Sequence, residues 1–317
     1  MRWSLNDFMF SLRTVFPLLL MMAVGFAARR LRIIRADGVR QANNCVFRVF
    51  LPLLLCFDVM DTELGAAVDG RTLAYAAVSV LCCFGAMFLL APLLAKQRNA
   101  RGVLIQGVAR SNYAIFGIPL VLNMYPNADT SIAALMVLIA VPIFNVLATV
   151  ALMIYGSEKP GFAKVAKGVA LNPLILGTVI GFGLWKLQFP LPSLLDAPLR
   201  SLASLASPLA LFLLGASLDF GKVRANARLL SIGVSGRLLI VPLLFLSIAV
   251  LLGIRDVSLA TLIALFASPT AVGSYPMAQQ MGGDEDLAAG QVVLTTAFSS
   301  LTVFFWVFVL KSLGFLA

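Results

Sequence analysis

The chain has 317 residues, of which 61% are hydrophobic and 12% are charged, and its mean hydropathy is +0.98. Soluble domains carry roughly 25% charged residues, so this composition excludes an ordinary soluble protein. The chain contains no histidine, which excludes a histidine metal site or a histidine proton relay. Its formal net charge is +10, but the basic residues concentrate in loops, which indicates membrane topology and not nucleic-acid binding.

Apolar runs recur along the whole chain, and each is long enough to cross a bilayer, which takes about 20 residues. The expected fold is therefore an all-α polytopic membrane protein of ten transmembrane helices. We read the first run as a helix because no small-residue cleavage site follows it. The expected spans are 8–28, 40–60, 72–95, 103–123, 131–155, 169–188, 199–218, 229–252, 258–281 and 287–310.

The loops predict the orientation. Those on one side carry most of the Lys and Arg, among them Arg29, Arg30, Lys96, Lys164 and Lys222. Positively charged loops stay in the cytoplasm, so we expect both termini outside and a multi-pass protein of the bacterial inner (plasma) membrane. The acidic stretch "GGDEDLAAG" lies on the same side and runs against the trend, although acidic residues contribute little to this rule.

Two halves of the chain resemble each other. "FPLLLMMAVGFAARRL" in the first span matches "NPLILGTVIGFGLWKL" in the sixth. Pro17 aligns with Pro173 and Pro52 with Pro208, both at an offset of 156 (173 − 17 and 208 − 52). Five spans per half is an odd number, so the second half would enter the membrane upside down. Residues 1–155 and 156–317 are thus predicted to be inverted repeats.

The stretches "SNYAIFGIPL" in span 4 and "SPTAVGSYPM" in span 9 are also related by this repeat. Both contain proline, which frees backbone groups inside a helix. Freed groups are tolerated in a membrane only where they are buried in protein or line a cavity. We expect spans 4 and 9 to be broken and to cross, with helix N-termini that favour an anion. The alternative is that the prolines only kink ordinary spans.

The candidate substrate-binding residues lie in these two motifs or, in one case, inside span 8. They are Ser111, Asn112, Tyr113, Gly117, Pro119, Ser268, Pro269, Thr270, Ser274, Tyr275, Pro276 and Arg237.

Each candidate also has a structural alternative. Asn112 and the neighbouring hydroxyls either bind a carboxylate or satisfy freed backbone groups. Tyr113 and Tyr275 either shape the pocket or pack. Arg237 either pairs with a substrate carboxylate or links helix C-terminal carbonyls. Arg110 either serves a second substrate carboxylate or extends to the cytoplasmic face, and we expect the second.

Acidic residues are absent from the chain beside both motifs, and Asp58 and Asp219 fall at span ends. A cation exchanger would need carboxylates at the midplane, so this absence favours an anion. The four cysteines, Cys45, Cys56, Cys82 and Cys83, lie in apolar segments and are expected to pack in the core.

The motifs "RSNYAIFGIPL", "NPLILGTVIGF", "SPLALFLLGASL" and "ASPTAVGSYPMAQQMGGDEDLAAGQVVLTT" resemble the auxin efflux carrier family, in its compact prokaryotic branch of malonate and malate permeases. The resemblance implies a sodium/proton-antiporter-like fold in which helices 4 and 9 cross. It implies that spans 1, 2, 6 and 7 form a scaffold, and that spans 3–5 and 8–10 form a transport part moving by an elevator mechanism. It also implies a carboxylate held near Asn112 and a possible homodimer through the scaffold helices.

The expected function is secondary active transport of a small organic carboxylate, either a malonate- or malate-like dicarboxylate or an auxin-like monocarboxylate. A proton or sodium gradient, or the membrane potential, would drive it, since no phosphate-binding loop of the ATPase type occurs. A sodium/proton antiporter of the same architecture is the alternative. We expect no enzyme activity, no cofactor and no metal site.

Overall fold

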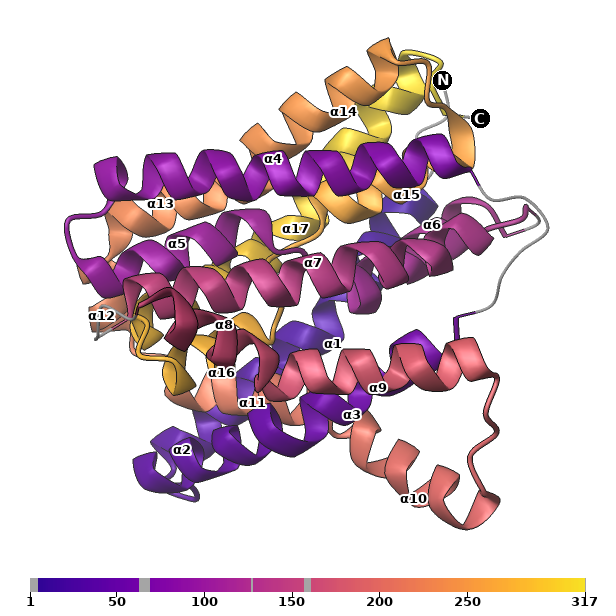
Figure 1. The fold of residues 1–317 in the computed structure, drawn as a ribbon. Coiled ribbons are helices and arrows are strands. Elements are labelled where there is room, and N and C mark those ends of the chain that lie inside the picture. Colours follow the sequence, from indigo (N-terminus) through magenta and orange to yellow (C-terminus); the bar gives the residue numbers. More distant parts are fainter. Residues whose placement is uncertain (1–4, 63–68, 127, 157–160, 317) are drawn as a thin grey trace.

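The computed structural model describes residues 5–62, 69–126, 128–156 and 161–316, which form helices joined by short connections (Figure 1). Elements α1 to α17 are α-helices and η1 to η3 are π-helical turns. In chain order they are α1 Leu5–Arg30, α2 Ala36–Cys45, η1 Val46–Phe50, α3 Leu51–Met60, α4 Gly70–Leu94, α5 Arg98–Ala109, η2 Tyr113–Gly117, α6 Ile118–Met124, α7 Ser131–Tyr155, α8 Phe162–Ala170, α9 Pro173–Leu187, α10 Ser193–Ser204, α11 Ala206–Ser217, α12 Phe220–Ala225, α13 Ala227–Ser235, η3 Gly236–Ile240, α14 Val241–Leu251, α15 Asp256–Ala267, α16 Ser274–Gln280 and α17 Glu285–Ser312.

The chain is a multi-pass membrane protein. Among the described residues, six helical stretches are long and apolar enough to cross a bilayer, and a seventh results if α8 and α9, bent by 52°, form one span. The sequence predicts ten spans. The fourth and ninth expected spans are each divided between shorter helices, so neither contains a continuous helix long enough to cross a bilayer.

Two helix pairs are held together by direct backbone contact. Helix α1 packs against α11, and α3 packs against α9. A Cβ atom at Gly25 would lie 1.9 Å from the carbonyl oxygen of Phe212, and one at Gly181 would lie 2.4 Å from that of Cys56. Lipid tails are as apolar as the helices, so small residues that allow close approach stabilise such pairs. Gly25 and Gly181 are the same glycine in the two matching sequence motifs.

The remaining long helices form a second group. Helix α5 packs against α4 and α7, α14 packs against α15, and α17 contacts both α13 and α15. In Figure 1 this group occupies the upper part of the molecule, whereas α3 and α9 run side by side below it. Helix α17 also contacts α1 and α11, so it joins the two groups.

The acidic stretch before α17 lies against basic loops. Arg40 Nη2 and Glu285 Oε1 are 2.9 Å apart, and Lys222 Nζ and Asp286 Oδ2 are 3.1 Å apart. The hydrogen bond with Asp286 raises the pKa of Lys222 above its ordinary value. The helix dipole also stabilises acidic side chains in the first turn of a helix. The acidic stretch, which was the exception among the otherwise basic loops on this side, therefore forms ion pairs with basic residues of those loops.

Candidate functional site: a cavity at the paired breaks

Helices α5 and α15 both stop inside the protein. Non-helical residues 110–112 follow α5, and residues 268–273 follow α15; we call these the crossover segments. Pro276 is the third residue of α16, where the N–H groups of a first turn have no helical acceptor and proline is tolerated. Pro119 is the second residue of α6, which continues the π-helical turn η2 directly, so it lies inside the helical run 113–124. In both segments the non-helical residues come before the proline.

The crossover segments pair with each other. Ser111 and Thr270 form an isolated antiparallel bridge, and the N–H of Asn112 donates to the carbonyl of Pro269 at 2.9 Å. Backbone groups that leave a helix inside a membrane protein need internal partners. Each segment supplies partners to the other, so the two interruptions stabilise each other.

Arg237 holds the ends of both interrupted helices. Its Nη1 donates to the carbonyl of Val108 at 3.1 Å, near the end of α5. Its Nη2 and Nε donate to the carbonyls of Leu265 and Ser268, at 2.7 and 2.8 Å, at the end of α15. A cation at helix C-termini is favoured by the helix dipole. The arrangement corresponds to the structural alternative for Arg237, since all three guanidinium nitrogens are occupied by carbonyl oxygens.

The hydroxyl groups beside the bridge are also bonded to backbone. Thr270 Oγ1 donates to the carbonyl of Gly107 at 2.6 Å, and the Tyr113 hydroxyl donates to that of Ala133 at 2.8 Å. Ser268 donates to a carbonyl one turn back in α15. These side chains support the crossover instead of offering a free hydroxyl.

A cavity of about 60 Å³ lies against the crossover segments. One water needs ~10–15 Å³ by the same kind of measure, so the space suits a group of a few heavy atoms. Its walls come from α3, α7, α9 and α11 together with both crossover segments. Its polar wall residues are Asp58, Arg110, Ser111, Asn112, Tyr113, Asn145 and Ser207.

Several hydrogen-bond donors in the wall of this cavity have no acceptor. Arg110 is buried, and its Nη2 donates to Asn145 Oδ1 at 2.8 Å while its Nη1 faces the sulfur of Met277. Arg110 forms no ion pair within the described part of the chain. The side-chain nitrogens of Asn112 and Asn145 and the hydroxyl of Ser111 are buried without a hydrogen-bond partner there. Buried polar groups normally have hydrogen-bond partners. These donors could therefore bond an acceptor group that enters the cavity.

Three of the sequence candidates line the cavity: Ser111, Asn112 and Tyr113. The candidates outside its walls are Gly117, Pro119, Ser268, Pro269, Thr270, Ser274, Tyr275, Pro276 and Arg237. Tyr275 instead contacts Ser217, with 2.5 Å between the two hydroxyl oxygens.

Three further wall residues were missed by the sequence analysis. Arg110 was expected to extend to the cytoplasmic face, but it is only 6% exposed because it turns toward Asn145. Asp58 was set aside as a span-end residue, yet it lines the cavity because α3 passes the crossover. Asn145 could have been found from the sequence, because it is an amide inside the otherwise apolar run of α7, and polar residues inside a span are functional candidates. In the structure it is fully buried.

A second, basic cavity of about 600 Å³ lies between α1, α2, α11 and α17. Tyr275 lines it, together with five basic and three acidic residues, an excess of two positive charges (5 − 3): Arg29, Arg30, Arg32, Arg40 and Lys222, and Asp219, Glu285 and Asp286. Positive charge around a cleft raises the local concentration of anions. This vestibule would attract anions toward the basic face of the molecule.

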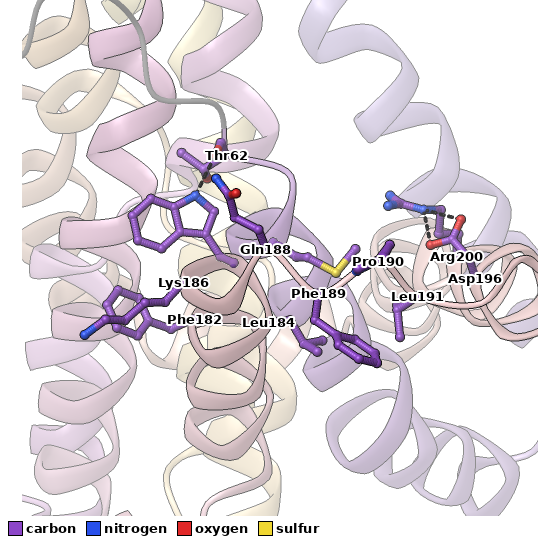
Figure 2. Close-up of a pocket in the computed structure, with 12 residues that line it drawn as sticks. Thr62, Phe182, Leu184, Lys186, Gln188, Phe189, Pro190, Leu191, Asp196 and Arg200 are labelled. Atoms are coloured by element: carbon purple, nitrogen blue, oxygen red, sulfur yellow. Dashed lines mark hydrogen bonds and ion pairs between the residues drawn. The ribbon is translucent and has the colours of Figure 1, made fainter.

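The largest of these cavities, about 960 Å³, lies where α3 and α9 end and α10 begins (Figure 2). The Trp185 indole N–H donates to the carbonyl of Thr62 at 2.8 Å. Arg200 pairs with Asp196 at 3.0 Å and also with Asp61. Arg200 and Asp196 there already have partners, so size alone does not make this cavity the better candidate.

Comparison with known proteins agrees with the fold. The family described as membrane transport protein matches residues 10–307. A "Putative malonate transporter" of Rhizobium meliloti is 28% identical over 158 residues, about half of each chain. Uncharacterized transporters of Methanocaldococcus jannaschii and Methanothermobacter thermautotrophicus are 24% and 25% identical over 95% and 96% of this chain and 99% of their own length.

The family match covers nearly the whole chain and coincides with a multi-pass helical fold. The motifs that carry the resemblance include the two crossover segments. This chain belongs to the membrane transport protein family, the family of the auxin efflux carriers.

Proposed function

We propose that this protein is a secondary active transporter of a small organic carboxylate, bound at the cavity beside the crossover segments. Arg110 would supply the positive charge for the carboxylate, and Asn112, Asn145 and Ser111 would donate hydrogen bonds to its oxygens. The carrying observation is that a buried guanidinium without an ion-pair partner shares one cavity with three unpartnered donors.

Energetics favour an anion over a neutral ligand. An isolated buried charge is costly unless a counter-charge or hydrogen bonds compensate it. A carboxylate offers both, because its two oxygens accept several hydrogen bonds and its charge balances Arg110. The first residues of the helical run 113–124 also line the cavity, and a helix N-terminus favours negative charge.

The cavity volume favours a small aliphatic acid. About 60 Å³ suits malonate or a compact dicarboxylate better than an aromatic acetate such as auxin. The bacterial relative that is named for malonate supports testing that acid first. The basic vestibule supports an anionic substrate by a separate observation.

We further propose ten transmembrane helices in two inverted repeats, with helices 4 and 9 broken at the crossover. The packing of α1 on α11 and of α9 on α3 supports this arrangement, because each pair joins the first span of one repeat to the second span of the other. The paired bridge at Ser111 and Thr270 supports a crossing of the two breaks.

An elevator movement follows from this division. The cavity takes part of its wall from α3, α9 and α11, which belong to the proposed scaffold, and the rest from α7 and the crossover segments of the proposed transport part. Sliding one part past the other would carry the site across the membrane. The scaffold helices could also form a homodimer, and the orientation with both termini outside the inner membrane is part of the same proposal.

A sodium/proton antiporter is the second candidate, and Asp58 in the cavity wall is the observation that favours it. A carboxylate there could bind a cation. Arg110 in the same wall opposes this function because it repels cations.

The test is uptake by purified protein in liposomes of labelled malonate, malate and an aromatic acetate, under imposed proton, sodium or potassium gradients. We expect saturable uptake of a small carboxylate that is lost in Arg110→Gln and reduced in Asn112→Ala. Asn123→Ala, an exposed asparagine of α6, serves as the matched control. Sodium-dependent proton movement without carboxylate uptake would replace this proposal by the antiporter.

A further inference from the structure

Asp58 is a carboxyl group in the cavity that has no partner. It lies on α3 and lines the same cavity as Arg110. Its backbone carbonyl accepts from the Thr62 hydroxyl at 3.0 Å. Its carboxyl forms no hydrogen bond or ion pair within the described residues, and the carboxylate of Asp61 acts on it by like-charge repulsion. The acid and the base of the cavity wall are thus both without a direct ionic partner.

Other charged groups near α3 are occupied or point elsewhere. Helix α10 supplies Asp196 and Arg200, and Arg200 also pairs with Asp61, three residues beyond Asp58. Lys186 of α9 lines the separate large cavity with them, and Arg48 of η1 is exposed.

Within the cavity itself, α7 and α11 contribute Asn145 and Ser207, which do not titrate between acid and neutral pH. Tyr113 is committed to a backbone carbonyl. Among the described wall residues, Arg110 is therefore the single cation that opposes Asp58.

The charge balance of the cavity depends on its occupant. When no anion is bound, the wall carries one acid and one base among its described residues, Asp58 and Arg110. A carboxylate substrate would add negative charge beside Asp58 in surroundings of low dielectric constant, where like charges repel strongly. Protonation of Asp58 removes this repulsion and leaves Arg110 to the substrate.

We propose that Asp58 takes up one proton when a carboxylate binds and carries it across the membrane, so that the protein is an anion–proton symporter. This inference rests on the proposed carboxylate site. The proton comes from water on the loading side and adds to a carboxylate oxygen of Asp58. On the other side the anion leaves first, which removes its negative charge from beside Asp58, and the proton returns to water.

Reciprocity makes the coupling measurable. If anion binding favours protonated Asp58, then protonation must tighten anion binding by the same factor. The affinity for the anion should therefore fall about tenfold for each unit by which the pH rises. This slope applies in the pH range where Asp58 is ionised in the empty protein and protonated in the complex. A protein without a titrating carboxyl in the cavity lacks this slope.

The experiment is calorimetric titration of the detergent-solubilised full chain with malonate, at a pH where malonate is fully ionised. Buffers of different ionisation enthalpy report the protons taken up per malonate bound. The wild type should take up about one proton, and Asp58→Asn should take up none while still binding malonate. Asp129→Asn, at an exposed carboxyl outside the cavity walls, is the matched control, and it should behave as the wild type does.

Each outcome is decisive. Binding without proton uptake in the wild type overturns the coupling proposal but leaves the carboxylate site standing. Proton uptake that persists in Asp58→Asn also overturns it. Absence of malonate binding by the wild type overturns both proposals. Asp58→Ser, a second neutral variant, must lose proton uptake as Asp58→Asn does, and unchanged melting temperatures show that the variants fold.

Discussion

Arg110 and Arg237 are both buried arginines that contact the crossover, yet their surroundings are opposite. Arg237 is 1% exposed, and all three of its side-chain nitrogens donate to backbone carbonyls. Arg110 is 6% exposed, and its recorded contacts are an amide oxygen and a thioether sulfur. All donor nitrogens of Arg237 are thus bonded within the protein, whereas Arg110 has no ionic partner among the described residues.

The comparison distinguishes two roles that a buried charged side chain can have in a membrane protein, a structural role and a ligand-binding role. Intramembrane ionisable residues are functional candidates by default, and the sequence alone gave Arg237 the stronger claim because it lies deep in a span. Hydrogen-bond satisfaction reverses that order. Because Arg237 already fills its donors, we expect it to determine folding, and we expect Arg110 to determine binding.

Removal of Arg237 should have the largest effect. Arg237→Ala leaves three helix-end carbonyls without their donor, at about 1–3 kcal/mol each when buried. We expect most of the protein to be lost from the folded fraction, measured by size-exclusion chromatography and thermal unfolding in detergent. Arg237→Lys should recover only part of the stability, since an ammonium cannot reproduce the guanidinium fork. A stable Arg237→Ala that has lost only transport would reverse the roles of the two arginines.

Arg110→Gln should show the complementary result. Truncation of one member of a buried charge pair costs about 2–5 kcal/mol, so malonate binding should weaken on the order of a hundredfold or more. The melting temperature without ligand should stay near that of the wild type, because Arg110 forms no ion pair within the described residues. Arg101→Gln, on the same helix, is the control. Undiminished binding in Arg110→Gln would remove the cation from the site.

Asn112→Ala should have an intermediate effect. A hydrogen bond to a charged group contributes about 1.5–3 kcal/mol, so binding should weaken roughly tenfold to a hundredfold. Its backbone bond to Pro269 does not involve the side chain and should persist. Equilibrium binding of labelled malonate, compared with Asn123→Ala, measures the difference. A loss of stability equal to the loss of binding would assign Asn112 a structural role instead.

The smallest effect is expected far from the cavity, at the Lys222–Asp286 pair. Exposed ion pairs contribute about 0–1 kcal/mol, so Lys222→Gln should lower the free energy of unfolding by less than about 1 kcal/mol. The pKa of Lys222 is raised by its partner, so this stability is present below the ordinary lysine pKa and is lost as pH rises through the raised one. Melting temperature against pH and salt checks the sign, with Arg224→Gln as control.

Much of the architecture could be read from the sequence. Breaks in spans 4 and 9 were predicted from proline, glycine and polar residues inside apolar runs, because these residues conflict with a continuous lipid-facing helix. In the structure α5 ends at Ala109 and α15 at Ala267, beside these motifs. The expected ends of α7 and α17 agree with the structure to within two residues. Helix α8 was not foreseen, because a short amphipathic segment beside a span resembles a basic loop.

The composition of the cavity wall could not be read in the same way. Asp58, Arg110 and Asn145 lie on different helices, and only tertiary packing brings them to one cavity. Ser268 and Thr270 looked like binding residues because their hydroxyls are polar, but backbone carbonyls already accept from them. Sequence patterns indicate which residues are polar and buried, while the partners that decide their roles come from helices distant in the chain.

The most direct measurement of the central claim is equilibrium binding of labelled malonate to the purified wild type and to Arg110→Gln, with the melting temperature of each recorded in parallel. Our account predicts saturable binding to the wild type, and loss of binding in Arg110→Gln without loss of stability. Equal binding by both proteins, or no binding of malonate or any other small carboxylate by the wild type, would contradict it.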